Sequence, residues 1–308
     1  MSKYRRSRTG LWSYGAAVVL IWLVLPLSAG AAAGGDIHPV RDVKPLYSYY
    51  ARTVSSVTVR TGGNYFHDMK LQEADDFDGY TIDMELIVPL LERLQFRFYY
   101  PAYTDGDATA YADGHGQDYP DGFDVDIHGA GGVLDFPSIN LDYQFWKADS
   151  PDGYNFSVTT GVGYILRYLK VEDKDTNDEI DRYNHRGAVW LFGLRMDHAL
   201  NPCCDLVANL GGRYYWDSDD IYIDNPDDDV FWLADASLAL IYKPQSFWAY
   251  PSIEMVYQGD LGDYTKFEVV PEVIIPLGRH FDLNAGVGIG LADDGPDYEG
   301  RVELNFHF

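Results

Sequence analysis

The chain has 308 residues, carries a formal net charge of −25, and is 15% aromatic. An acidic balance of this size argues against nucleic acid as a partner, because phosphates are bound by Lys and Arg. The two cysteines, Cys203 and Cys204, are neighbours and support neither a disulfide framework nor a four-ligand zinc site. We predict no cofactor.

The amino terminus has the pattern of a secretory signal peptide. Four basic residues lie between positions 3 and 8, an apolar run follows over 16–27, and small residues come next. The run is shorter than the ~20 residues of a spanning helix, which argues against an uncleaved anchor. We predict cleavage after 1–33, with the three alanines at 31–33 as the site. Removal of the four basic residues changes the net charge to −29.

The rest of the chain has no second long apolar run, so any membrane crossing must use strands. Residues 34–53 contain two prolines and no clear period, and we interpret them as a periplasmic lead-in. The first strand is predicted over 54–66, with an acidic loop over 68–78. A mean hydropathy of −0.24 is typical of alternating apolar and polar residues.

The clearest strand pair covers 80–90 and 94–100, joined by a short turn at 91–93. Six apolar residues at every second position from Tyr80 to Leu90 are a strong strand signal. The longest irregular stretch follows, over 102–135. Loops of this length are uncommon unless they are functional. Three interpretations stay open for it: a constriction loop, an external recognition loop or an extra hairpin.

The second half repeats one unit of strand, short turn, strand and longer acidic loop. The predicted strands are 139–146, 156–168, 185–196, 206–216, 231–242, 247–257, 266–275, 283–291 and 301–308. Short turns fall at 201–202, 243–245 and 276–280. Longer loops fall at 172–184, 217–229, 258–264 and 292–298. Short periplasmic turns and longer outer loops are typical of bacterial outer-membrane barrels.

The last strand alternates apolar and polar residues and ends on an aromatic residue. This ending resembles the closing strand of outer-membrane barrels, and the resemblance implies that Phe306 and Phe308 signal to the barrel-assembly machinery. We therefore predict an all-β fold: a transmembrane antiparallel up-and-down β-barrel of about twelve strands over 54–308, in the outer membrane of a Gram-negative cell.

A soluble β-sandwich is the competing fold. It requires more uniformly apolar inward residues than this chain offers, because many charged residues share the inward phase. The predicted inward-facing charged residues are Arg60, Asp83, Glu85, Arg97, Asp142, Arg167, Arg195, Arg213, Asp235, Glu254, Glu268, Glu272, Asp282, Arg301 and Glu303. They either line a narrow aqueous pore or pair and close it. Three inward glycines, Gly286, Gly288 and Gly290, leave space on one wall.

No catalytic motif stands out. His307 beside Asn305 suggests a Ser-His-Asn arrangement, yet no suitable serine accompanies them. Residues 173–177 begin like a calcium loop, but Asp178 replaces the glycine that the loop requires. We predict a protein that is not an enzyme and has no dedicated metal site.

A family resemblance is carried by four stretches: 85–96, 100–101, 131–135 and 141–145. They resemble the phenol meta-pathway degradation family of outer-membrane barrels, which are assigned to transport. The resemblance implies a transport function and an aromatic or hydrophobic substrate. Where that family usually has G-x-G-D and K-Y-R-F, this chain has Gly-Val-Leu-Asp and Asp-Tyr-Gln-Phe.

We expect an outer-membrane channel for small solutes. Acid in the outer loops, with Asp217, Asp219 and Asp220 at the outer mouth, predicts a preference for cations or neutral solutes. The expected partners are outer-membrane lipid and lipopolysaccharide, the latter through divalent cations. A closed structural or adhesive barrel is the alternative function, and an outer-membrane hydrolase is a third.

Overall fold

The computed structural model of the chain describes residues 44–70, 74–112, 118–132, 135–150, 153–166, 168–174, 179–183, 186–216, 230–244, 247–260, 264–292 and 294–308. The signal peptide predicted over 1–33 lies outside these residues. Within them, no helix is long and apolar enough to cross a membrane.

Fifteen strands account for the regular structure of the described residues. They are β1 Thr58–Met69, β2 Ala74–Leu91, β3 Leu94–Ala112, β4 Asp118–Ala130, β5 Ser138–Trp146, β6 Tyr154–Leu166, β7 Tyr168–Asp173, β8 Glu179–Tyr183, β9 Arg186–Asn201, β10 Cys204–Trp216, β11 Val230–Tyr242, β12 Tyr250–Gly259, β13 Thr265–Pro276, β14 Phe281–Gly290 and β15 Tyr298–His307.

Twelve of these strands form a closed antiparallel barrel, as the sequence predicts. Around the ring the order is β1, β2, β3, β5, β6, β9, β10, β11, β12, β13, β14 and β15. The last strand pairs with the first, from Thr58 opposite His307 to His67 opposite Tyr298. Closure removes the sheet edges, whose unpaired backbone groups are very unfavourable in lipid. We call the end with the short turns and the carboxy terminus the turn end, and the other the loop end.

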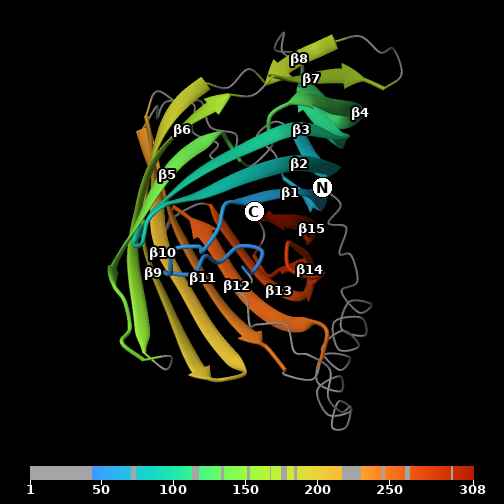
Figure 1. Cartoon of the computed structure of the whole chain (residues 1–308). Helices are drawn as coiled ribbons and strands as arrows, with labels where there is room; N and C mark the ends of the chain where they lie inside the picture. The colour runs from blue at the N-terminus through green and yellow to red at the C-terminus, as the bar shows by residue number, and fades with distance from the viewer. Residues whose placement is uncertain are drawn as a thin grey trace.

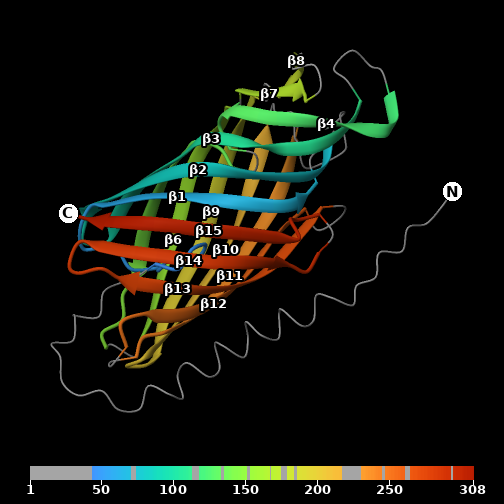
Figure 2. The same cartoon turned by 90° about the vertical axis from the view of Figure 1, so that its right-hand side faces the viewer.

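The remaining three strands extend the barrel wall at the loop end (Figures 1 and 2). The first half of β3 pairs with β5, and its second half, from Tyr103, pairs with β4. β4 then pairs with β7, and β7 with β8. The hairpin interpretation of 102–135 is therefore the right one, and the predicted loop 172–184 holds β8 and the end of β7.

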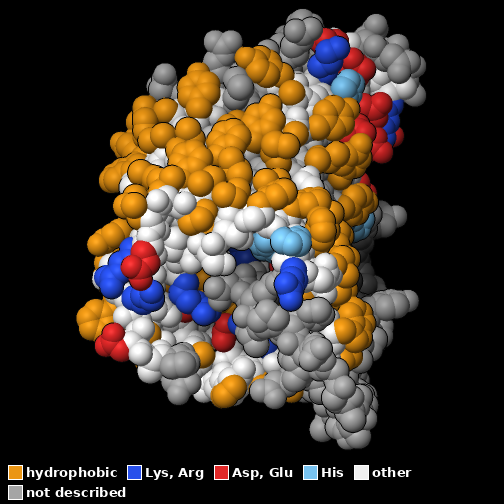
Figure 3. Space-filling model, in the orientation of Figure 1, with side chains coloured by type: hydrophobic (Ala, Val, Ile, Leu, Met, Phe, Trp, Pro, Cys, Tyr) orange, Lys and Arg blue, Asp and Glu red, His pale blue; other side chains and the backbone are white. Residues whose placement is uncertain are grey.

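The barrel wall separates lipid-facing from inward-facing side chains by the period of two. In β5, Ile139, Leu141 and Tyr143 are 43–48% exposed, whereas the alternate residues Asn140 and Asp142 are 4–5% exposed. Figure 3 shows the result on one face, a broad area of hydrophobic side chains with charged groups gathered below it and on the extension. Such an exterior suits lipid, where only a closed barrel satisfies the backbone of strands.

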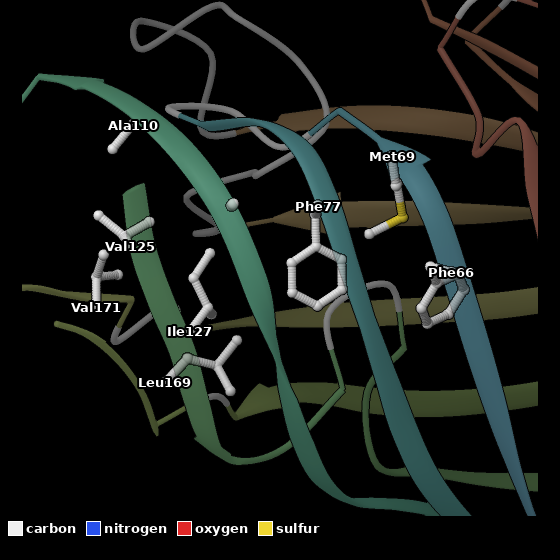
Figure 4. Close-up of a cluster of buried hydrophobic side chains, with 9 residues drawn as sticks. Phe66, Met69, Phe77, Ala110, Val125, Ile127, Leu169 and Val171 are labelled. Atoms are coloured by element: carbon white, nitrogen blue, oxygen red, sulfur yellow. The ribbon is translucent and has the colours of Figure 1, made fainter. Parts of the chain in front are cut away.

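The interior is layered. Charged and polar side chains fill its middle, and apolar clusters flank them towards both ends. At the turn end Tyr50 packs with inward residues of β10 to β13, among them Val207 and Ile274. At the loop end one cluster surrounds Phe136 and Tyr215, and another lines the extension (Figure 4). Inward apolar residues thus gather towards the two ends of the barrel, where a few polar residues such as Asp205 and Lys266 accompany them.

Candidate functional site

Residues 44–54 lie inside the barrel, and we call them the inner segment (Figure 1). The sequence places this stretch in the lead-in and gives no sign of a position in the lumen. Seven of its backbone N–H groups donate to side-chain oxygens of the wall: Leu46 to Glu272 (3.0 Å), Tyr47 and Ser48 to Glu254 (2.9 and 2.8 Å), Tyr49 to Asn209 (2.8 Å), Ala51 and Arg52 to Asp197 (2.8 and 3.1 Å), and Val54 to Gln95 (2.9 Å).

The wall is shaped to receive this segment. A Cβ added to Gly286 would lie 2.7 Å from Cδ1 of Leu46, so this glycine makes room for the segment, as its inward phase suggests. Arg52 of the segment pairs with Asp197 (3.1 Å) and Asp205 (3.4 Å). Carboxylates that accept charged or backbone N–H groups form the stronger class of hydrogen bonds, so the inner segment is firmly held.

Tyr49 joins the inner segment to the arginines of the wall. Its ring lies 4.2 Å from the guanidinium of Arg97 and 4.6 Å from that of Arg195, within the range of cation–π contacts. Its hydroxyl donates to Glu85 at 2.8 Å. Burial, followed by the charge of Glu85, raises the pKa of Tyr49 to about 12. The hydroxyl therefore stays protonated and keeps this bond over the physiological pH range.

The central charges form one connected network. Asp142 lies between Arg97 (2.6 Å) and Arg195 (2.9 Å), and Glu85 lies between Arg60 (2.7 Å) and Arg97 (3.3 Å). Glu303 joins Arg60 to Arg301, which also reaches Asp83 at 3.3 Å; Arg213 pairs with Asp235 at 3.0 Å. The sequence alone assigns no partner to each arginine. In the structure Arg97 also contacts Glu85, and Arg195 reaches Asp142 across β6.

The structure places most of the predicted inward residues inside the barrel. Ten are buried charged side chains packed among the wall strands: Arg60, Asp83, Glu85, Asp142, Arg195, Glu254, Glu268, Glu272, Asp282 and Glu303. Arg97 is buried too, and Arg213, Asp235 and Arg301 are partly exposed within the lumen. Arg167 and the outer-mouth residues Asp217, Asp219 and Asp220 lie outside the described residues.

Sequence reasoning missed several lumen residues. Asp197, Lys266 and Glu299 lie two positions from the predicted Arg195, Glu268 and Arg301. They share the same strand phase, which is the signal that identifies them. Lys266 lies 3.2 Å from Glu268 and 2.8 Å from Glu299. No sequence pattern of this kind identifies the contacts between the inner segment and the barrel wall.

A cavity of about 310 Å³ lies in the lumen beside the inner segment. Tyr47 and Tyr49 of the segment form part of its lining, and wall residues of most barrel strands form the rest. These include Arg97, Arg195, Arg213, Asp235, Lys266, Glu299 and Arg301. The site that the structure offers is therefore a chamber inside the barrel with a mixed polar and apolar lining.

His307 closes the barrel seam and is not paired with Asn305. Its Nδ1 lies 3.1 Å from Oγ1 of Thr58 in β1, and its Nε2 lies 2.6 Å from Oδ2 of Asp282 in β14. Asn305 instead accepts a bond from Arg60 at 2.9 Å. The Thr58 hydroxyl belongs to a residue that is only 5% exposed, and this set of hydroxyl, imidazole and carboxylate joins three neighbouring strands of the wall.

Metal ligands are not gathered in the part of the chain that the structure describes. No group of three or more His, Cys, Asp or Glu side chains there is arranged to hold an ion. Asp175 and Asn177 of the imperfect calcium loop fall outside it. Cys203 and Cys204 are partly exposed free thiols.

Deletion of Phe308 is expected to lower the level of folded protein in the membrane. Its backbone N–H donates to the carbonyl of Val57 at 2.9 Å, while its ring is 75% exposed and available to another protein. Heat-modifiable gel mobility of membrane fractions measures the effect. The control is Phe281→Leu, which removes the ring that packs on Phe306 but keeps the carboxy terminus. Equal levels of the deletion and the control would contradict a role in assembly.

No protein-family model matches the sequence, and no curated protein matches it. The fold has solved relatives. The transport unit of the autotransporter AIDA-I from Escherichia coli is 13% identical, with a TM-score of 0.55 over 87% of this chain and 93% of that one. The translocator domain of autotransporter NalP from Neisseria meningitidis is 12% identical, with a TM-score of 0.52 over 96% of this chain and 98% of that one.

An outer membrane channel from Pseudomonas putida F1 aligns with a TM-score of 0.49 at 12% identity, over 87% of this chain and 100% of that one. At these identities the comparisons concern the fold. The two autotransporter barrels, whose TM-scores exceed 0.5, agree with the closed ring of strands and its apolar exterior, and they lead to one conclusion: the chain has the fold of a bacterial outer-membrane β-barrel, a fold that resides in the outer membrane.

Proposed function

We propose that this protein is an outer-membrane channel for small solutes. The observation that carries the proposal is the interior, where buried ion pairs and a cavity of about 310 Å³ occupy the place of a packed apolar core. A barrel of twelve strands is wide enough to hold water beside its side chains. The inner segment narrows this lumen and sets how freely solutes pass.

The family resemblance of stretches such as 85–96 supports a hydrophobic or aromatic solute. The acidic loops support a preference for cations or neutral solutes, because carboxylates at a mouth concentrate cations. The same carboxylates suit divalent cations that bridge to lipopolysaccharide. We infer no enzymatic role, since the buried Thr58 hydroxyl is a poor nucleophile for an outside substrate.

A closed structural or adhesive barrel is the second candidate. The seven backbone bonds of the inner segment favour it, because a firmly held segment obstructs the lumen. Single-channel conductance of the mature protein in planar bilayers separates the two functions. Discrete conductance steps support the channel, and a folded protein without conductance supports the closed barrel.

Reversal potentials in a salt gradient test the control of selectivity. Neutralising Asp217, Asp219 and Asp220 together to Asn is expected to lower cation preference, because their field is screened only beyond about 10 Å at 0.1 M salt. Folding is expected to persist, since exposed loop charges contribute little to stability. The matched control neutralises Glu92 and Asp149, exposed at the turn end. If the wild-type protein were anion-selective, the arginines of the lumen, and not the acidic loops, would determine the ion selectivity.

A further inference from the structure

The charged groups around the lumen cavity are neutralised within the wall. Each cationic side chain in the lining has a carboxylate within 3.0 Å: Arg97 and Arg195 have Asp142, Arg213 has Asp235, Lys266 has Glu299 and Arg301 has Glu303. A charged solute that enters loses hydration and meets groups that are already paired. The cavity therefore favours an uncharged solute.

Two of these pairs present both of their members to the cavity. They are Arg213 with Asp235 at 3.0 Å and Lys266 with Glu299 at 2.8 Å. A donor and an acceptor thus lie side by side at two places in the lining. A hydroxyl group donates one hydrogen bond and accepts others, so it can engage both members of such a pair at once.

Neutral polar side chains supply further partners for hydroxyl groups. The lining includes Asn64, Ser138, Asn140, Thr159, Asn209, Ser237 and Gln258. Asn64 is 4% exposed, and its Oδ1 has no hydrogen-bond partner among the described residues. A buried amide oxygen in this state costs free energy until a ligand or water donates to it.

The apolar part of the lining is as extensive as the polar part, and it combines aliphatic side chains such as Leu191 and Leu210 with aromatic rings. Tyr99, Tyr257 and Phe136 line the same cavity, and such rings pack well against the C–H groups of a saturated ring. The volume of about 310 Å³ is at the lower end of ligand pockets, which begin at about 300 Å³. A wholly apolar solute would leave Oδ1 of Asn64 without a hydrogen-bond donor, which costs free energy.

We infer that this cavity binds a small uncharged polyhydroxyl solute of monosaccharide size. The inference rests on the proposed channel function, for which it names a solute class. It differs from the aromatic substrate that the family resemblance implies. The hydroxyl groups of such a solute would bond to the donor and acceptor pairs and to the amide oxygen of Asn64, while its C–H groups would pack on the aromatic rings.

The test is a binding titration on the full mature protein, folded in detergent and followed by saturation-transfer NMR. Glucose is the probe, with toluene, benzoate and choline as the apolar, anionic and cationic comparison solutes. Saturable binding of glucose, tighter than that of the other three, is expected. Tighter binding of toluene or benzoate, or no saturable binding of glucose, would overturn the inference.

The decisive variant is Asp235→Asn, which keeps the size of the side chain but removes the charge that neutralises Arg213. Glucose affinity is expected to fall about tenfold, the effect of losing one hydrogen bond to a charged group, while benzoate affinity rises. Ser237→Ala removes one hydroxyl from the lining and is expected to weaken glucose binding less. Ser157→Ala is the control, since Ser157 is a buried lumen residue outside the cavity lining.

Heat-modifiable mobility verifies that each variant is folded. Unchanged glucose affinity in both folded cavity variants would overturn the inference. Conductance, measured separately, distinguishes the two proposals. Conductance without glucose binding would support the channel function and contradict the polyol-binding cavity. Glucose binding without conductance would support the cavity and contradict the channel function.

Discussion

Deletion of residues 44–54 is expected to raise single-channel conductance several-fold. The inner segment fills part of the lumen, and Leu46, Ser48 and Ala51 are almost wholly buried there. Its removal uncovers the carboxylates of Glu254 and Glu272, which accept its backbone N–H groups. These carboxylates then face water, so the barrel is expected to remain folded and its cation preference to increase.

Planar-bilayer recordings of the deletion and of the full mature protein measure both effects. A double variant, Glu254→Leu with Glu272→Leu, removes three of the seven acceptor contacts and is expected to give an intermediate conductance. Glu92→Gln in an exposed turn serves as the control and is expected to conduct like the wild type. A folded deletion protein with wild-type conductance would show that the segment does not limit the pore.

Replacement of Asp142 by Asn is expected to destabilise the barrel by about 3–5 kcal/mol, the usual effect of breaking a buried ion pair from one side. Asp142 is 4% exposed and lies between the guanidinium groups of Arg97 and Arg195. It also accepts from the amide of Gln95 at 2.9 Å. Asn keeps the volume but leaves two buried positive charges facing each other.

Urea unfolding in lipid vesicles, followed by tryptophan fluorescence, measures this change. The matched control is Glu92→Gln, because Glu92 also pairs with a basic residue, Lys147 at 2.8 Å, but in an exposed turn. No measurable change is expected there, since solvent screens exposed pairs. Equal stability of the two variants would show that the lumen network is hydrated enough to tolerate the loss.

The wall of the barrel could be predicted from local sequence because its two environments differ sharply. In β5, Ile139, Leu141 and Tyr143 face lipid while Asn140 and Asp142 face inward, and the period of two reports this directly. The same phase identifies the central charges. The phase does not predict which charges pair across strands. Arg195 of β9 and Asp142 of β5 are separated by β6, so they meet only when the three strands lie side by side in the barrel.

The sequence predicted strands and their inward faces less well where inward and outward side chains are both apolar or both polar. Val207, Ala239 and Ile274 are inward yet apolar, because they pack against one another and against Tyr50 near the turn end. In the extension, Val125 and Ile127 of β4 and Val171 of β7 form a shared buried face that no single stretch reveals. For this reason the sequence at 102–135 left the hairpin as only one of three open interpretations.

The sequence by itself determined a closed barrel of about twelve strands with a polar, charged centre, since alternation and turn spacing are local properties of the chain. Only the tertiary structure decided that residues 44–54 enter the lumen and that β4, β7 and β8 extend the wall. The physical reason is that the inner segment is held by contacts far apart in sequence, such as the backbone of Tyr47 to Glu254 and of Leu46 to Glu272. Such contacts exist only after the barrel has brought its strands together.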